Sequence, residues 1–253
     1  MRRFSVRLGR VLGIELRLHA SWFLVFGLVV WATSAGFGEL YPRRSDVMHV
    51  AMGVVTGLAF FVCLTAHELA HSAVARRFDV HVRGITLFLF GGVAEIRGEL
   101  PTPGREFAVA LVGPAVSVLL GATFGLAAES TQGIVAGMLV TLALVNLGVG
   151  VFNLVPGLPL DGGRLLRAGL WRLTGSYERA TLVASTGGRV VAVLLCLLGV
   201  ILAVAGDPVG LWYVPMGVFL WLLAAAAGRS GRSGAPGALA LDHREGEAPQ
   251  PGP

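Results

Sequence analysis

Six long runs of apolar residues, separated by short polar connections, dominate the pattern along this chain. Each run is close to the roughly 20 residues that a helix needs to cross the hydrocarbon core of a bilayer. The pattern therefore predicts six membrane-spanning helices, at residues 20–38, 47–75, 107–128, 134–155, 183–205 and 211–227.

Two further segments follow a different pattern. Residues 4–19 alternate apolar and basic side chains, which predicts strands on the cytoplasmic surface. Residues 85–96 are apolar but too few to span, and they contain Gly91 and Gly92, so they predict a β-hairpin that turns at the two glycines. The expected fold class is an all-α polytopic membrane protein with six transmembrane helices, N-terminal surface strands and a small membrane-associated β-hairpin between the second and third spans.

Composition agrees with a membrane protein and excludes a large soluble core. Apolar residues make up 55% of the 253 positions and charged residues only 14%, with a mean hydropathy of +0.74. Residues 1–228 form the expected core of the protein. Residues 229–253 are rich in Gly, Pro, Ser and Ala and are predicted to be a disordered cytoplasmic tail.

The placement of basic residues predicts the orientation. The chain has no Lys, so its cationic side chains are arginines. The connections on one side of the predicted spans contain only two of these arginines, Arg43 and Arg44. By the positive-inside rule both termini are expected in the cytoplasm, in a multi-pass protein of the cell membrane. The sequence pI of about 10.2 therefore reflects topology and predicts no nucleic-acid partner. A cleaved signal peptide is the alternative for the N-terminus, but the segment before residue 20 is too long and too patterned, which favours an uncleaved first span.

One cluster of ionisable residues lies inside the second predicted span, as His67-Glu68-Leu69-Ala70-His71. Ionisable groups cost roughly 2.5 to 3.5 kcal/mol each at the centre of a membrane helix on insertion scales. His67 and His71 are four residues apart, so both imidazoles project from one helix face and can bind a single Zn²⁺. Glu68 lies about 100° round the helix, where it can reach a water at the open position of the metal.

A catalytic zinc usually has three protein ligands, so one more is expected elsewhere. Arg76 follows His67 by nine residues, or about 14 Å along a helix, which puts the metal in the cytoplasmic half of the bilayer. Among the acidic residues Asp161 fits this depth best, directly after the fourth span. Glu95, Glu99 and Glu106 are weaker alternatives from the connection between the second and third spans.

The residues around Asp161 also favour it. Two prolines and three glycines surround it at the end of an apolar helix, so the backbone there is expected to unwind. Unwound backbone at membrane depth is tolerated where it lines a water-filled cavity or is buried in protein. A zinc site needs such a cavity.

Together these motifs resemble the site-2 protease family of intramembrane zinc metalloproteases, peptidase family M50. The resemblance covers about residues 4–228. Within the family, the chain is similar to the compact six-span prokaryotic branch. No PDZ domain lies between the metal motifs, and no CBS pair follows, so regulation through CBS domains is not expected. The residues that carry the resemblance are the HExxH motif at 67–71, then Asn153, Pro156, Pro159, Asp161, Gly162 and Gly163, with further matches at Gly91 to Glu95 and at Gly113-Pro114.

The resemblance implies one Zn²⁺ per chain, held by His67, His71 and Asp161, with Glu68 as the general base. It implies that Asn153 binds the developing oxyanion, although an Asn in a span is equally an interhelical hydrogen-bonding residue. The implied activity is hydrolysis of peptide bonds within or near the transmembrane segments of single-pass proteins, in regulated intramembrane proteolysis. An anti-sigma-factor-like regulator is one candidate substrate.

The hairpin is expected to dip toward the zinc and to lend an edge strand to the substrate, through Phe88, Phe90, Gly91 and Gly92. A helix hides its carbonyls in i→i−4 hydrogen bonds, so a substrate helix must open before attack, and an edge strand replaces the lost bonds. The alternative is a hairpin that only packs at the membrane surface. Two alternative functions remain, another membrane HExxH metallopeptidase and a metal-binding membrane protein without catalysis.

Overall fold

The fold of the chain is given by a computed structural model that describes residues 5–88, 91–97 and 100–232. Six of its helices are long and apolar enough to cross a membrane, as the sequence predicts. The elements follow one another as β1 (Ser5–Val11), β2 (Ile14–His19), α1 (Ser21–Leu40), α2 (Asp46–Arg76), β3 (His81–Phe88), β4 (Gly91–Arg97), α3 (Pro103–Glu129), α4 (Gly133–Asn153), α5 (Asp161–Thr174), α6 (Tyr177–Val204) and α7 (Gly210–Arg232).

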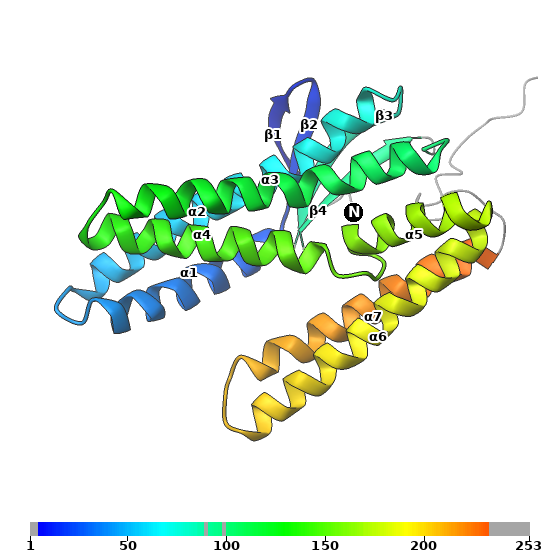
Figure 1. Cartoon of the computed structure of the whole chain (residues 1–253). Helices are drawn as coiled ribbons and strands as arrows, with labels where there is room; N and C mark the ends of the chain where they lie inside the picture. The colour runs from blue at the N-terminus through cyan, green and yellow to red at the C-terminus, as the bar shows by residue number, and fades with distance from the viewer. Residues whose placement is uncertain (1–4, 89–90, 98–99, 233–253) are drawn as a thin grey trace, which may run out of the picture.

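The helices form two groups that α5 connects. Helices α1 to α4 lie side by side, while α6 and α7 form a separate pair (Figure 1). Helix α5 contacts α3 on one side and α6 on the other. Helix α5 is additional to the six predicted spans. The apolar pattern does not reveal it, because α5 is amphipathic and too short to span the membrane. Its first residue is Asp161, so the helix that joins the two groups also carries a predicted metal ligand.

The four strands form one sheet in the order β1-β2-β3-β4. Strands β2 and β3 pair in parallel, with Leu16 opposite Ile85, so the predicted N-terminal strands and the predicted hairpin are joined. The inner face of this sheet packs on α1, α2 and α3. Its core consists of Ile14, Leu16, Leu18, Val82, Ile85 and Leu87 together with Trp22, Phe61 and Val109.

The turn of the second hairpin differs from the prediction. Phe88 pairs with Gly91 and Leu87 with Gly92, so both glycines belong to β4, and the predicted turn does not lie at these glycines; residues 89–90 lie outside the described residues. Gly92 is needed in the strand for another reason, since a Cβ atom there would lie 2.9 Å from Cδ of Glu68. Glycine within a strand often marks such a close approach.

The last helix runs past the expected end of the core. Helix α7 continues to Arg232, whereas the composition places the start of the tail at residue 229. The rest of the tail, residues 233–253, lies outside the described residues.

Candidate metal centre

Two histidines of α2 face each other across one helical turn. His67 and His71 are both buried, and their Nε2 atoms lie 3.1 Å apart. Their rings meet at an interplanar angle of 78°. The i, i+4 spacing therefore brings the two imidazoles together as the sequence predicts.

Asp161 completes the cluster from the first turn of α5. Its Oδ2 lies 3.3 Å from Nε2 of His67 and 3.0 Å from Nε2 of His71. Ligand atoms about 2.0 to 2.1 Å from a tetrahedral Zn²⁺ are separated from one another by about 3.3 Å. The three donor atoms thus have the spacing that a single zinc ion requires, and among the described residues they form the one cluster of three or more potential ligands.

The outer ring nitrogens are held by α3. Nδ1 of His71 lies 2.6 Å from the carbonyl oxygen of Val109, and Nδ1 of His67 lies 2.8 Å from Oγ of Ser117. A carbonyl oxygen only accepts, so Nδ1 of His71 carries the proton and Nε2 of the neutral ring keeps its lone pair. Such partners fix the tautomer of metal-binding histidines. The centre therefore gathers lone pairs and a carboxylate, and this donor set fits a cation.

The unwound segment before α5 positions Asp161. The backbone N–H of Leu158 donates to the carbonyl of Ala184 in α6, with an N···O distance of 3.0 Å. A Cβ atom on Gly162 or Gly163 would overlap the backbone of Leu154 or Gly157. The two glycines after the Asp are required because the chain folds back directly against them.

The charge of Asp161 is balanced by a guanidinium. Burial tends to raise the pKa of its carboxyl, and the positive charge of Arg164 tends to lower it. Nη1 of Arg164 lies 3.5 Å from Oδ1 of Asp161. Arg164 therefore favours the anionic carboxylate, which is the form in which Asp binds a metal.

Glu68 lies beside the cluster and outside it. It follows His67 on α2, is half-buried, and packs against the backbone of β4 at Gly92. Among the described residues β4 is an edge strand of the sheet, and its face at Gly92 contacts the side chain of Glu68.

Helix α3 passes directly over the two imidazoles at Gly113. A Cβ atom at this position would overlap Nε2 of His71 and lie 2.7 Å from Nε2 of His67. Only glycine lets α3 approach closely enough for Val109 and Ser117 to reach the rings. These three residues are spaced four apart and so share one face of α3.

Replacing Gly113 by Ala is therefore expected to lower zinc affinity at least about 10-fold, a loss typical of displacing groups that orient metal ligands. The measurement is zinc retention after dialysis of the purified protein against a series of chelator concentrations. The matched control is Gly125→Ala on the same helix, where the nearest atom to the new Cβ, in Ala143, is 3.9 Å away. Equal zinc retention in both variants would contradict this account of Gly113.

A buried ion pair joins α3 to α5. Nε of Arg167 donates to Oε1 of Glu106 at 2.8 Å, and Nη2 of Arg167 contacts the same oxygen. Glu106 is 2% exposed, and the guanidinium of Arg167 also lies 4.8 Å from the centre of the Tyr177 ring. Glu106, an alternative third ligand on sequence grounds, therefore pairs with Arg167 and lies outside the metal cluster.

Replacing Arg167 by Gln is expected to destabilise the protein by about 3 kcal/mol, because it leaves the charge of Glu106 buried without a partner. Chemical unfolding in detergent, followed by circular dichroism, measures this loss. The control is Arg172→Gln, an exposed position on the same helix, for which a change within about 0.5 kcal/mol is expected. Indistinguishable unfolding curves for the two variants would refute a stabilising role of the pair.

The remaining predicted site residues lie around this centre or outside the described residues. Asn153 ends α4, and its Nδ2 donates to the carbonyl of Val149 at 3.0 Å. Phe88 is half-buried at the end of β3, whereas Phe90 lies outside the described residues. Glu99 and the side chain of Glu95 are also outside them.

Four residues around the centre could not be assigned a role from the sequence: Val109, Ser117, Arg164 and Arg167. The signal for the first two is the four-residue spacing with Gly113, which places a small residue and a hydroxyl on one face of the third span. Arg164 lies one turn after Asp161 on α5 and Arg167 one turn after Arg164, but no apolar run in the sequence indicates that helix.

Comparisons with known proteins agree with this centre. The family model described as peptidase family M50 matches residues 55–133 and 123–197, which include both metal motifs. The chain belongs to peptidase family M50. This membership makes it a relative of zinc metalloproteases, and the His67, His71 and Asp161 cluster fits the zinc of that family.

Relatives in this family cover most of the chain. It is 42% identical over 231 residues to Rip3 of Mycobacterium tuberculosis, whose name describes a zinc metalloprotease, covering 89% of this chain and 58% of Rip3. A similarly named protein of Synechocystis is 36% identical over 90% of this chain and 60% of its own length. The chain thus spans somewhat more than half the length of these curated relatives.

A solved structure has the same fold. The site-2 protease from Methanocaldococcus jannaschii superposes with a TM-score of 0.64 and 29% sequence identity, covering 89% of this chain and 96% of that one. The arrangement of spans and sheet is therefore that of an M50 site-2 protease.

Proposed function

We propose that this M50 protein is a zinc-dependent endopeptidase that hydrolyses peptide bonds within or near the transmembrane segments of single-pass membrane proteins. The observation that carries the proposal is the location of the centre. His67, Glu68 and His71 lie in α2, a helix long and apolar enough to span the membrane, and Asp161 meets them from α5. A protease with its reactive centre in a spanning helix acts on substrates that enter the membrane.

In this proposal His67, His71 and Asp161 hold the zinc and Glu68 handles protons. The bound zinc supplies Lewis acidity, which polarises a carbonyl and makes a water more acidic. The Glu68 carboxylate accepts a proton from the attacking water and returns it to the amine of the leaving peptide. Ser117 and the Val109 carbonyl keep both imidazoles oriented throughout, which is the role of such partners in metal sites.

Asn153 is proposed to contribute to the oxyanion site. One of the two Nδ2 hydrogens is used by the Val149 carbonyl, which leaves the second for another acceptor. Asn153 also ends α4, at the start of the segment that leads to Asp161. A donor at this position could stabilise charge that develops on the substrate carbonyl.

The orientation proposed for the protein follows from its arginines. Both termini lie in the cytoplasm, and the centre lies in the cytoplasmic half of the bilayer, because only Arg43 and Arg44 fall in connections at the opposite end of the spans. Cleavage would then release a fragment on the cytoplasmic side.

Strand β4 is proposed to receive the substrate backbone. It is an edge of the sheet, and at Gly92 it lies against Glu68, so a chain added to that edge would pass the proposed base. Added strands gain main-chain hydrogen bonds that replace those of an opened substrate helix.

Photocrosslinking tests this role of β4. A crosslinking amino acid at Val93 of β4, in a Glu68→Gln background, is expected to trap a bound single-pass substrate close to its cleavage site. The matched control carries the same group at Val6 of β1, the other edge of the sheet, and is expected to trap much less. Equal trapping at both edges would argue against substrate binding along β4.

The substrate class is tested in membranes. Quantitative proteomics should compare cells that express the wild-type protein with cells that express Glu68→Gln. An uncleaved single-pass protein, such as an anti-sigma-factor-like regulator, is expected to accumulate with the variant. Identical membrane proteomes under conditions where both proteins are made would oppose the proposed function.

A further inference from the structure

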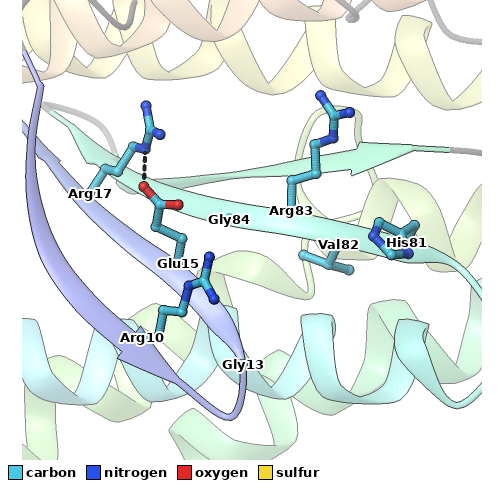
Figure 2. A pocket seen from close by; sticks show the side chains of 8 residues that line it. All are labelled: Arg10, Gly13, Glu15, Arg17, His81, Val82, Arg83 and Gly84. Atoms are coloured by element: carbon cyan, nitrogen blue, oxygen red, sulfur yellow. Dashed lines mark hydrogen bonds and ion pairs between the residues drawn. The ribbon is translucent and has the colours of Figure 1, made fainter.

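A basic cavity lies on the sheet, away from the metal centre. It has a volume of about 430 Å³ and lies between the β1–β2 turn and the start of β3 (Figure 2). Its lining contains three arginines and one histidine but a single carboxylate. The lining residues are Arg10, Gly13, Glu15, Arg17, His81, Val82, Arg83 and Gly84.

A β-bulge in β1 gathers basic side chains on one face of the sheet. Arg7 lies opposite Arg17, and Arg10 lies opposite Glu15, with the register shifted between them. In a regular strand residues three apart point to opposite faces, but the bulge puts Arg7 and Arg10 on the same one.

A second bulge, in β3, adds a further cation. The register shifts between Val82 and Gly84, which leaves Arg83 as the extra residue. Figure 2 shows the side chains of Arg10, Glu15, Arg17 and Arg83 extending to the same side of the sheet. Bulges re-aim side chains in this way, so two irregularities in different strands contribute to one cavity.

The lining has more positive charges than its one carboxylate can neutralise. Glu15 is the one acidic residue in the lining, and its Oε1 is shared by Nε of Arg17 at 2.8 Å and Nε of Arg7 at 3.5 Å. Arg10, which lies opposite Glu15, also interacts with it electrostatically, and over the described residues Arg83 has no hydrogen bond or ion pair through its side chain. Like charges opposite each other destabilise a sheet, so an anion bound here would relieve repulsion.

The cavity lies at the end of the spanning helices. Helix α1 begins at Ser21, four residues after Arg17, and Arg76 at the end of α2 donates to the carbonyl of Leu12 in the β1–β2 turn. Exposed apolar side chains belong to the same hairpin, with Val6 65%, Leu8 58% and Leu12 69% exposed. The hairpin carries its cations on the outer face of the sheet, whereas Val6, opposite Leu18, points to the inner face. Cations and exposed apolar groups on one hairpin suit the surface of a bilayer.

We propose that this cavity binds the phosphate of an anionic phospholipid headgroup. Guanidinium groups match the geometry of phosphate oxygens, and basic residues next to a span are attracted to anionic lipids. The exposed apolar side chains of β1 would contact the acyl chains, a role that free phosphate or an acidic peptide would leave unfilled. The site is independent of the proposed peptidase chemistry, because none of its residues belongs to the metal centre.

The test uses the full chain in neutral detergent and native mass spectrometry. Phosphatidylglycerol and phosphatidylcholine with identical acyl chains are titrated separately, and inorganic phosphate forms a third arm. The variant is Arg10→Gln with Arg83→Gln. The matched control, Arg43→Gln with Arg44→Gln, removes the same charge from the exposed connection between α1 and α2. Zinc content of each variant serves as the check that it is folded.

The wild type and the control are expected to bind phosphatidylglycerol and to prefer it over phosphatidylcholine. The cavity variant is expected to bind it about 25-fold more weakly, at about fivefold for each arginine. Equal affinity in the cavity variant and the control would overturn the proposal. Competition by millimolar inorganic phosphate that removes the lipid would also overturn it, by assigning the site to free phosphate.

Discussion

Replacing Glu68 by Gln is expected to reduce peptide hydrolysis by about 100-fold or more while the protein stays folded and keeps its zinc. The size follows from the usual contribution of a positioned general acid or base, about 10² to 10⁴ in rate. Zinc should remain because Glu68 lies outside the cluster of His67, His71 and Asp161. Gln has nearly the same shape, so its contact with β4 at Gly92 is preserved.

The measurement compares cleavage of a reconstituted single-pass substrate with zinc content per chain. Glu129→Gln is the matched control, since it makes the same change at the end of α3, far along the helix from Gly113. Undiminished cleavage by Glu68→Gln would remove Glu68 from the mechanism. Lost zinc in that variant would instead assign it to the metal.

Replacing Asp161 by Ala is expected to weaken zinc binding by more than about 100-fold, beyond the 10- to 100-fold cost of changing an outer partner of a metal site. The two histidines alone cannot complete a site that usually requires three protein ligands. The variant should also lose hydrolysis, because the zinc and its Lewis acidity are lost together.

Equilibrium dialysis of zinc against a chelator measures this effect, with Asp207→Ala in the α6–α7 connection as the control. Other membrane HExxH proteases use a glutamate from a later helix as the third zinc ligand. If this chain belonged to that class, Asp161→Ala would lose no zinc. Retained zinc in that variant would therefore favour this alternative class over the centre described here.

Much of the centre could be predicted because its signals are local. The spacing of His67 and His71 places them on one helix face whatever surrounds them. The depth of Asp161 could be counted along helices from the arginines, because a bilayer restricts where charges lie. The six spans were likewise accessible, since apolar length alone indicates them.

The features that could not be predicted from the sequence depend on contacts between distant segments. Any strand offers the same backbone donors and acceptors, so nothing local indicates that β2 pairs with β3 in parallel. Helix α5 is short and amphipathic, and its pairing of Arg167 with Glu106 in α3 depends on how the two helices pack. The role of Gly113 also appears only when α3 is placed against the imidazoles.

The glycines of the second hairpin illustrate the same limit. Two adjacent glycines after an apolar run predict a turn, but Gly91 and Gly92 are paired strand residues. Glycine permits both a turn and a close approach of backbone to another group, and the sequence does not distinguish these uses. Here the close approach is to Glu68.

The central claim is that a zinc-dependent protease cuts its substrate within the membrane, and mapping the cleavage site tests it most directly. A single-pass substrate reconstituted in liposomes with the protein should be analysed by mass spectrometry, with and without a zinc chelator. We predict a cut inside or next to the transmembrane segment, nearer its cytoplasmic end, which the chelator abolishes and added zinc restores. Cleavage confined to the soluble parts of the substrate, or undiminished by the chelator, would contradict the account.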